Sequence, residues 1–384
     1  MTRHNVHKIA IVVPKYGLVG GAEQFVSALT EQIALNSRYE IHVFANKWRQ
    51  LTNRIKFHKV PVIVFPKFLT TISFAYFVRK KIAGIEFDLI HAHDRIFDAD
   101  IFTMHGIPHR IWVEEVRKKR MSLFDYGTAW VEKRLIENSR CKKFIAVSTL
   151  SRGKFLKQYS TVDQEKIAVI HPGIDTKRFK TLDRLTCRRE IMQRYHIDSS
   201  DKIILFVSMN FDIKGLDFLV KALSRLKTRY PSEKFKLLVV GKGNEKKYGM
   251  MAGNLGIRDR VIFTGIMSRE HLERIYVASD IFAMLSRFDT FGMAALEAMA
   301  ASLPVIISSN VGAKDLIRQG LNGYVTDSKD STDEIADKIR LMLEEEVQAK
   351  MARNAFNTAA THTWDDVTGK VEGIYEDVLK KVTS

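Results

Sequence analysis

The sequence predicts an α/β fold of two Rossmann-like domains that face each other across a cleft. Apolar, strand-like runs alternate with longer helical patterns along all 384 residues, which is typical of βαβ units around parallel sheets. A charged stretch with little periodicity, residues 175–185, separates two complete series of such units. The length also suits two domains, each with a hydrophobic core of its own.

Each half of the chain has its own series of expected strands. In the first half they are residues 9–14, 39–45, 60–65, 87–93, 102–106, 144–148 and 167–173. In the second half they are residues 202–209, 236–243, 260–265, 281–286 and 303–309. Helical patterns lie between them, for example at 22–35 and 217–230, and another helical pattern, at 364–382, follows the last strand unit. The expected divisions are a first domain at 1–180, a second at 181–365 and a C-terminal helix at 366–384.

Composition excludes some classes of protein. The only two cysteines, Cys141 and Cys187, have no metal-ligand spacing and fit a reducing compartment. No secretory signal is expected at the start of the chain. Residues 62–78 are largely apolar, but Pro66 and Lys67 interrupt them. They predict a buried strand followed by a partly apolar surface helix, not a membrane span.

The positive charge is concentrated in one half. The net charge is +17, and residues 1–180 hold 31 Lys and Arg against 16 Asp and Glu. The remaining residues hold 30 against 28. This asymmetry favours an anionic partner for the first domain, either nucleic acid or a phosphorylated or anionic membrane surface.

Two features of the first domain follow strands. Gly20 and Gly21 open a helix after the first strand, where backbone N–H groups can approach a phosphate or a sugar. His105 ends another strand and can present a ring nitrogen to the cleft. A structural turn and a buried core histidine are the alternatives. His91 and His93 are expected to be structural.

A possible metal motif lies between these features. Asp98 and Asp100 have the D-x-D spacing that holds a divalent ion with a nucleotide diphosphate. Three-residue matches arise easily by chance, and this one falls on a probable helix. We therefore assign no metal site.

A lysine and a glycine follow the first strand of the second domain. Lys214 and Gly215 lie in the loop before a helix, where a lysine can meet a diphosphate and the helix dipole adds to its effect. A solvated lysine is the alternative.

The strongest motif is residues 289–300. Asp289, Phe291 and Gly292 follow a strand, and Glu297 lies about two turns into the next helix. A carboxylate accepts hydrogen bonds from vicinal hydroxyls, which is what a ribose presents. An amphipathic helix with solvated acids is the alternative.

Together these motifs resemble the family 4 retaining glycosyltransferases of GT-B fold. The glycine pair, the Lys-Gly loop and the acid-bearing helix occur in the order of that family. So do residues 144–148, 171–179, 239–243, 261–268, 288–306 and 311–325. Within the family, residues 208–215 and the basic aromatic segment after His105 look most like the glucosyltransferases that act on the heptose of the lipopolysaccharide core.

The resemblance implies roles for the nucleotide-binding residues. Glu297 would hold the ribose hydroxyls. Lys214 would neutralise the diphosphate leaving group, together with backbone N–H groups near Gly20 and Gly21. Departure of the diphosphate is the step that develops charge, so no metal and no cofactor are needed.

The donor sugar would be bound by other members of the set. The resemblance implies that Asp289, Phe291 and Gly292 contact the hexose and the phosphate region, and that His105 binds the sugar near its reacting face. His105, Lys214 and Asp289 are thus the expected catalytic residues. No carboxylate nucleophile is evident.

Three positions depart from the family pattern. Asp289 stands where the family usually has Glu, so its contact to the sugar shifts by one methylene. Met209 stands where an arginine usually shares the phosphate charge, and Ala313 replaces the second glycine of a late turn. The first two departures weaken any assignment of a particular donor.

The first domain carries a candidate surface for the acceptor. Residues 110–137 interleave basic and aromatic side chains, which suits an anionic lipid interface. The candidate acceptor and membrane residues are Arg110, Trp112, Arg117, Lys118, Lys119, Arg120 and Trp130. A solvated helix with ordinary aromatic packing is the alternative.

These observations predict a retaining hexosyltransferase that needs no metal. Its donor is a nucleotide sugar, with UDP-glucose favoured over GDP-hexoses, and its acceptor is a membrane-associated glycolipid such as lipopolysaccharide core or another phosphorylated acceptor. The expected location is the cytoplasmic face of the membrane, with an anionic membrane surface and no nucleic acid as partners. The alternatives are a sugar-nucleotide epimerase of GT-B fold and a non-enzymatic basic protein that binds lipid or nucleic acid.

Overall fold

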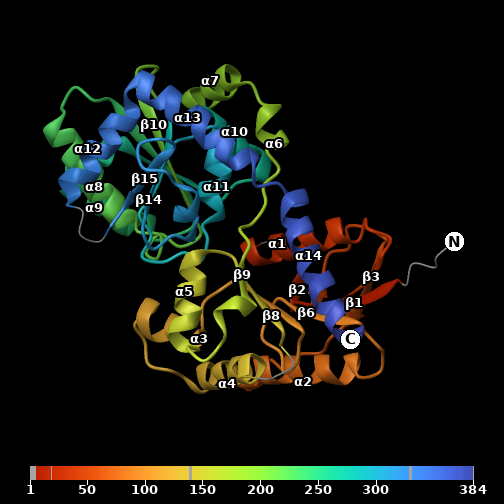
Figure 1. Cartoon of the computed structure of the whole chain (residues 1–384). Helices are drawn as coiled ribbons and strands as arrows, with labels where there is room; N and C mark the ends of the chain where they lie inside the picture. The colour runs from red at the N-terminus through yellow and green to blue at the C-terminus, as the bar shows by residue number, and fades with distance from the viewer. Residues whose placement is uncertain (1–5, 19, 138–140, 328–330, 384) are drawn as a thin grey trace. The chain divides into compact units, whose positions relative to one another are not determined.

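The computed structural model describes residues 6–18, 20–137, 141–327 and 331–383. The chain forms two compact units (Figure 1). Unit 1 comprises Met1–Gly173 and Trp364–Ser384, and unit 2 comprises Ile174–Thr363. The divisions therefore fall at Gly173 and Thr363, compared with the expected 180 and 365.

The core of unit 1 is a parallel sheet of seven strands in the order β5-β3-β1-β6-β7-β8-β9. Its strands are β1 (His7–Val12), β3 (Tyr39–Ala45), β5 (Ile55–Lys59), β6 (Leu89–Ala92), β7 (Ile101–Met104), β8 (Lys143–Ala146) and β9 (Ile167–Val169). The central strands are buried on both faces, which explains their continuous apolar runs. A separate short pair, β2 (Lys15–Tyr16) and β4 (Lys47–Trp48), lies outside this sheet.

Helices cover the sheet of unit 1. They are α1 (Gly21–Ile33), α2 (Leu69–Ile82), α3 (His109–Ile111), the π-helical turn η1 (Trp112–Val116), α4 (Leu123–Glu137), α5 (Thr149–Gln158) and α14 (Trp364–Thr383). The last helix, α14, packs beside α1 (Figure 1). Tyr375 of α14 reaches the buried sheet, where its hydroxyl lies 2.7 Å from Nδ1 of His91.

Unit 2 is built around a parallel sheet of six strands in the order β12-β11-β10-β13-β14-β15. Its strands are β10 (Lys202–Ser208), β11 (Phe235–Gly241), β12 (Val261–Gly265), β13 (Ile281–Met284), β14 (Val305–Ser308) and β15 (Gly323–Thr326). Its principal helices are α6 (Lys177–Lys180), α7 (Arg184–Tyr195), α8 (Leu216–Arg229), α9 (Glu245–Asn254), α10 (Arg269–Ala278), α11 (Met293–Ala300), α12 (Thr332–Leu343) and α13 (Glu345–Ala360).

The structure differs from the expected strands in several places, because β2, β4, β5 and β15 were not among them and residues 60–65 form no strand. Residues 60–65 were expected to form a strand, but β5 covers Ile55–Lys59 and the chain then runs as a loop. Val64 and Phe65 of this loop are exposed, so the apolar run marks a surface segment and not a core strand. β15 has only four residues, which is too short for a run to show a period of its own in the sequence.

Both sheets reverse their strand order beside the first strand of their unit. In unit 1, β1 lies between β3 and β6, and in unit 2, β10 lies between β11 and β13. In open α/β sheets, ligands bind outside the carboxyl ends of the strands at such a reversal. The loops after β1, β6 and β7, and those after β10 and β13, are therefore the places to search for a site.

Candidate functional site

In unit 2, an ion pair joins the loops that follow β10 and β13. Nζ of Lys214 lies 2.5 Å from Oδ2 of Asp289, and both side chains are mostly buried. Gly215 shapes the first loop: it has a φ of 72°, and a Cβ there would lie 1.9 Å from the carbonyl oxygen of Leu285. Any other residue would push the two loops apart, so glycine is required beside the lysine.

The loop that carries Asp289 is fixed by the backbone beyond β14. The N–H of Asp289 donates to the carbonyl oxygen of Asn310 at 2.9 Å, and its own carbonyl accepts from Gly312 at 3.0 Å. Gly292, with a φ of 94°, then opens α11 close to Val311. The side chain of Phe291 is buried, so a ligand at this loop would meet its backbone and not its ring.

Glu297 is held one turn further along α11. The hydroxyl of Tyr276 donates to Oε2 of Glu297 at 3.1 Å. Burial raises the pKa of Glu297, while the nearby Arg178 opposes that rise. Arg178 is itself held by Glu273, 2.7 Å from its Nε. The carboxylate is thus fixed in orientation and suited to accept hydroxyl hydrogen bonds.

Met209 stands where the family usually has an arginine; it follows β10 and is 62% exposed. Arg287 follows β13, but both carboxylate oxygens of Asp217 hold its guanidinium, at 2.8 and 2.7 Å. Lys214 is therefore the cation of this edge that the family pattern predicts and the structure places beside Asp289.

In unit 1, Gly20 and Gly21 start α1 as the sequence suggested, but the carboxylate of Glu23 lies beside them. Gly20 has a φ of 152°, and a Cβ there would lie 2.0 Å from a carboxylate oxygen of Glu23. An acidic side chain therefore lies at the N-terminus of α1. An anion bound by these backbone N–H groups would have to displace it.

Three histidines cluster near the ends of β6 and β7: His91 in β6 and His93 after it are buried, and His105 after β7 is half-buried. His91 bonds Tyr375 and Thr103 through its two ring nitrogens, both at 2.7 Å. Nδ1 of His93 lies 3.0 Å from Nε2 of His105. Burial lowers the pKa of all three: to about 3 for His91, to about 4 for His105 and well below the ordinary range for His93. All three rings are therefore neutral at pH 7.

His105 is packed from the side of α1. The ring of Phe25 meets His105 edge-on, with ring centroids 4.9 Å apart, and Trp364 packs edge-on against Phe25 at 5.5 Å. His93 and His105 also line a cavity of about 240 Å³ at the carboxyl ends of β6 and β7. The start of α14 thus supports the histidine that the sequence analysis chose.

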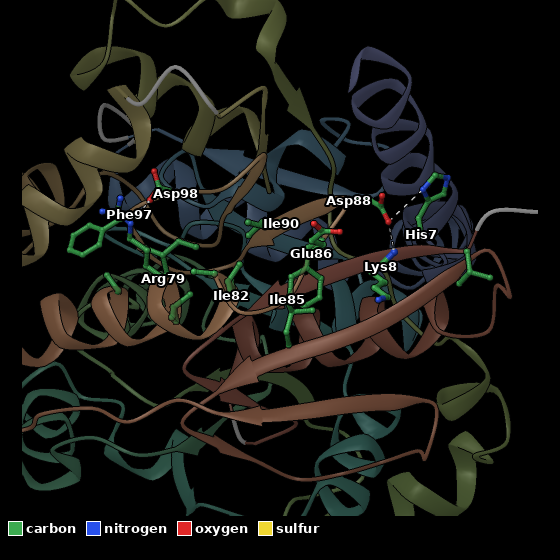
Figure 2. A pocket seen from close by; sticks show the side chains of 16 residues that line it. His7, Lys8, Arg79, Ile82, Ile85, Glu86, Asp88, Ile90, Phe97 and Asp98 are labelled. Atoms are coloured by element: carbon green, nitrogen blue, oxygen red, sulfur yellow. Dashed lines mark hydrogen bonds and ion pairs between the residues drawn. The ribbon is translucent and has the colours of Figure 1, made fainter. Parts of the chain in front are cut away.

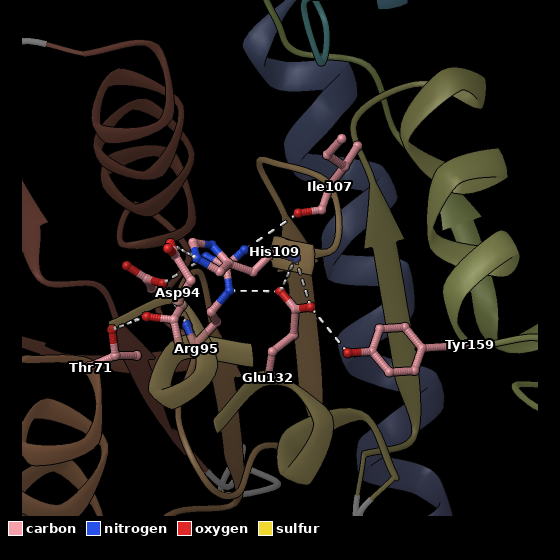
Figure 3. Close-up of polar contacts among 9 residues, drawn as sticks. Thr71, Asp94, Arg95, Ile107, His109, Glu132 and Tyr159 are labelled. Carbon is pink, nitrogen blue, oxygen red and sulfur yellow. Dashed lines mark hydrogen bonds and ion pairs between the residues drawn. The ribbon is translucent and has the colours of Figure 1, made fainter. Parts of the chain in front are cut away.

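Glu132, a buried carboxylate among the residues that line this cavity, accepts several hydrogen bonds (Figure 3). Glu132 of α4 accepts from Nε of Arg95 at 2.7 Å and from the N–H of His109 at 2.9 Å. It also accepts from the hydroxyl of Tyr159 at 3.1 Å. This network could not be predicted from the sequence, since Arg95 and Glu132 are 37 residues apart and belong to no shared motif.

The D-x-D motif has a structural role. Oδ2 of Asp100 accepts from the N–H of Ile90 at 2.9 Å, and Asp98 pairs with Arg79 at 3.6 Å. The two carboxylates thus fasten neighbouring segments of unit 1. Among the residues that the structure describes, no three His, Cys, Asp or Glu side chains gather so as to hold a metal ion.

The basic aromatic segment lies on the surface of unit 1. Its candidate residues are exposed apart from Trp112, which is half-buried: Arg110, Arg117, Lys118, Lys119, Arg120 and Trp130. Leu123, just beyond the basic run, is 75% exposed. None of the helices within the described residues is both long and apolar enough to cross a bilayer.

The loop before α2 extends this surface with apolar side chains. Phe65 is 87% exposed, and Val64 and Phe68 beside it are also exposed. Nζ of Lys67 lies 5.2 Å from the ring centroid of Phe124, so the loop adjoins α4. We call Val64, Phe65, Phe68, Leu123 and Tyr126, with the basic residues at 117–120, the basic–apolar face.

A larger cavity of about 820 Å³ opens at the amino ends of β1 and β6, opposite the carboxyl ends of the same sheet (Figure 2). It lies between α2 and the first residues of β1 and β6, and both apolar and charged side chains line it. Its charged rim pairs Arg79 with Asp98 and His7 with Asp88. No residue expected to bind donor or acceptor lines it.

Two units with parallel sheets, each with polar side chains gathered at the carboxyl ends of its strands, define a protein of GT-B architecture. Two family models match the chain: Glycosyltransferase Family 4 at residues 19–178 and Glycosyl transferases group 1 at residues 188–360. Together they span most of its length. The chain belongs to the GT-B glycosyltransferases that combine these two domains.

Two curated relatives illustrate the range of sequence similarity. An uncharacterised glycosyltransferase of Methanocaldococcus jannaschii is 25% identical, over 97% of this chain and 99% of its own. A D-inositol 3-phosphate glycosyltransferase of Stackebrandtia nassauensis is 27% identical over 62% of this chain and 54% of its own. The match to this second relative thus spans about half of its length.

Solved structures show the same fold at lower identity. WaaG, a glycosyltransferase involved in lipopolysaccharide biosynthesis, superposes with a TM-score of 0.78 at 20% identity, over 95% of this chain and 99% of its own. HepE of Anabaena, solved with UDP-glucose, gives a TM-score of 0.72 at 19% identity, over 97% and 100%. At these identities the likeness concerns the fold.

Proposed function

We propose that this glycosyltransferase is a retaining enzyme that transfers glucose from UDP-glucose to a membrane-associated glycolipid. One observation carries the donor half of the proposal: the loops after β10 and β13 bring Lys214 and Asp289 into contact, and α11 continues from the same loop to Glu297. A cation for a diphosphate and two carboxylates for hydroxyls thus lie along one edge of unit 2.

The chemistry of this edge follows from the charge that develops. When the glycosidic bond to the diphosphate breaks, negative charge grows on the leaving oxygen. The backbone N–H groups at the start of α11 are fixed by the helix, and Lys214 would join them in stabilising that charge once the diphosphate replaces Asp289 beside its ammonium group. Asp289 shares the ammonium of Lys214 in the unliganded chain and would turn to the hexose hydroxyls once the diphosphate takes its place.

The choice of donor is supported by resemblance and by a structural relative. Glu297, oriented by Tyr276, offers an acceptor to two vicinal hydroxyls, as a ribose requires. HepE, which shares the fold, was solved with UDP-glucose. Retention of anomeric configuration and the donor-sugar role of His105 stay predictions of the family resemblance.

The acceptor half of the proposal rests on the basic–apolar face of unit 1. Exposed apolar side chains such as Phe65 and Leu123 lower the free energy of the system when they enter a bilayer. Each cation near an anionic surface adds about 1 kcal/mol to the membrane affinity. A lipid-linked acceptor would bring such a surface with it. The inner-core lipopolysaccharide subtype and the cytoplasmic membrane face are the particular form that the resemblance favours.

A thermal-shift panel tests the donor site. UDP, UDP-hexoses, GDP and GDP-hexoses are each added to the wild type and to Glu297→Ala, without added metal. We expect stabilisation by uridine nucleotides in the wild type and its loss in the variant. Stabilisation by guanosine nucleotides instead would change the donor, and no shift with any nucleotide would overturn the proposal.

The epimerase alternative makes a different prediction. An enzyme that only remodels the nucleotide sugar has no need of the basic–apolar face, so neutralising residues 117–120 would leave its turnover unchanged. A transferase acting on a lipid-linked acceptor would lose activity toward vesicle-bound acceptor while still binding UDP. A non-enzymatic basic protein would show no response to nucleotide sugars at all.

A further inference from the structure

We propose that the cavity of about 240 Å³ in unit 1 binds an uncharged, hydroxyl-bearing sugar ring, and that Nε2 of His93 hydrogen-bonds one of its hydroxyls. This inference rests on the proposed function, because it identifies the cavity as the place where the sugar of the acceptor is recognised. The sequence alone gave His93 a structural role.

His93 is buried, and only one of its ring nitrogens is used. Nδ1 lies 3.0 Å from His105, whereas Nε2 has no hydrogen-bond partner among the residues that the structure describes. The side chain is 95% buried, given a relative exposure of 5%. A buried polar atom without a partner is costly, so an atom of this kind beside a cavity points to a ligand that satisfies it.

The size of the cavity limits the ligand. Pockets for drug-sized molecules are roughly 300–1,000 Å³, and this one is smaller. Its volume suits a single sugar ring and is too small to enclose a whole nucleotide. It opens beside His105 and Gly106, and its lining includes Ala22 at the start of α1.

The charges around the cavity argue against a phosphate. The charged lining residues are Arg95, Asp94 and Glu132, one cation against two carboxylates. Arg95 lies 2.7 Å from Glu132 and 3.6 Å from Asp94, so its charge is already balanced. The histidines beside it are neutral because burial lowers the pKa of each. An anion in the cavity would therefore meet no unpaired cation among these lining residues.

A hydroxyl fits whichever tautomer the histidine pair adopts. If His105 donates to Nδ1 of His93, then Nε2 of His93 carries the proton and donates to the ligand. If His93 donates to His105, then Nε2 accepts. A hydroxyl can take either part, and a phosphate oxygen can only accept. The cavity is thus matched to an alcohol function.

Two variants of His93 distinguish the roles of its two ring nitrogens. The amide of Asn reaches about as far as Nδ1, and that of Gln about as far as Nε2. His93→Asn therefore keeps a group for His105 and removes the group for the ligand, whereas His93→Gln restores it. His196→Asn is the control, because His196 is exposed and has a φ of 52°, which Asn tolerates.

The experiment is saturation-transfer NMR of the full chain with methyl α-glucoside and methyl α-mannoside, with UDP present, followed by a challenge with inorganic phosphate. We expect at least one glycoside to bind the wild type, the control and His93→Gln, and about ten-fold weaker binding to His93→Asn. Unchanged UDP binding would show that the donor site in unit 2 is intact, and a circular dichroism spectrum like that of the wild type would show that His93→Asn is folded.

Three results would overturn the inference: no glycoside binding to the wild type, equal binding to His93→Asn, or displacement of the glycoside by phosphate. Each leaves the proposed function standing as long as UDP binds. Failure of UDP to bind the wild type would instead contradict the proposed function, and the glycoside measurements would still decide the role of His93.

Discussion

Lys214 and Asp289, 75 residues apart in the sequence, meet with 2.5 Å between ammonium and carboxylate. The contact joins the loops of two neighbouring parallel strands at the point where the strand order reverses. An ion pair at such a place keeps a cation oriented toward the ligand while no ligand is bound. Its position, at the carboxyl ends of the strands where open α/β sheets bind nucleotides, makes it the centre of the proposed donor site.

Removing the cation should slow the chemical step. Lys214→Ala is expected to lower kcat by about 10²–10³-fold, with a smaller change in KM, because the lysine acts mainly on the leaving diphosphate. Release of UDP under steady-state conditions measures this. The matched control is Lys221→Ala on the exposed face of α8, which should retain wild-type turnover. A loss confined to KM would show that Lys214 only holds the ground state.

Tyr276 should matter through Glu297. Its hydroxyl donates to Oε2 at 3.1 Å, so Tyr276→Phe leaves the carboxylate without that support. One lost hydrogen bond of about 1 kcal/mol corresponds to roughly a five-fold weaker affinity for UDP, measurable by calorimetry. Tyr195→Phe, which loses a contact to His271, serves as the control. Equal affinity of Tyr276→Phe and wild type would argue against a role for Glu297 in the ribose contact.

Two glycines with positive φ should differ in their tolerance of alanine. A Cβ at Gly241, at the end of β11, would lie 1.8 Å from the carbonyl oxygen of Ser208, whereas one at Gly256 would meet nothing within 4 Å. Both substitutions strain the backbone, by about 1 kcal/mol for the residue itself. Gly241→Ala should add a steric cost and unfold at lower denaturant concentration. Equal midpoints would contradict the close approach of β10 and β11.

Acid should destabilise unit 1 through its histidines. Burial lowers the folded-state pKa of His105 to about 4 and that of His91 to about 3, from the ordinary 6.5. As the pH falls below 6.5, the unfolded chain takes up protons that the folded chain refuses, so stability is full above 6.5 and declines toward pH 4. Chemical unfolding at pH 7.5, 5.5 and 4.5 measures the slope. His91→Gln should flatten it, and an unchanged slope would place the acid sensitivity elsewhere.

The basic–apolar face should govern binding to vesicles. Replacing both Phe65 and Leu123 by serine removes apolar side chains that are 87% and 75% exposed. We expect at least ten-fold weaker sedimentation with phosphatidylglycerol–phosphatidylcholine vesicles, since each buried apolar side chain contributes about 1.5–3 kcal/mol. Leu185→Ser, at a leucine that is 73% exposed in unit 2, should bind like the wild type. Equal binding of all three proteins would remove this face from the membrane contact.

The sequence predicted the two parallel sheets well, because their central strands are long, buried runs. Residues 39–45 coincide with β3, and residues 202–208 of the expected 202–209 form β10. The strand predicted at 60–65 was wrong because an apolar surface segment can have the same composition as a core strand. Periodicity cannot tell the two apart over six residues.

The donor site of unit 2 and the cavity of unit 1 were predictable from the sequence to different degrees. Lys214, Asp289 and Glu297 belong to motifs whose order along the chain is informative, and the structure places Lys214 beside Asp289. The hydrogen bonds of Glu132 and the unused nitrogen of His93 depend on which side chains meet across neighbouring strands. Such contacts have no signature in a single sequence.

Transfer of radiolabelled glucose from UDP-glucose to lipopolysaccharide trimmed to its inner core, presented in anionic vesicles, decides whether the protein glucosylates a lipid-linked acceptor. We expect label in the lipid fraction with wild-type protein, and little or none with Lys214→Ala or Glu297→Ala. Label that stays in the aqueous phase with the wild type, while UDP still binds, would contradict a glycolipid acceptor. Equal transfer by Lys214→Ala would contradict the proposed donor site.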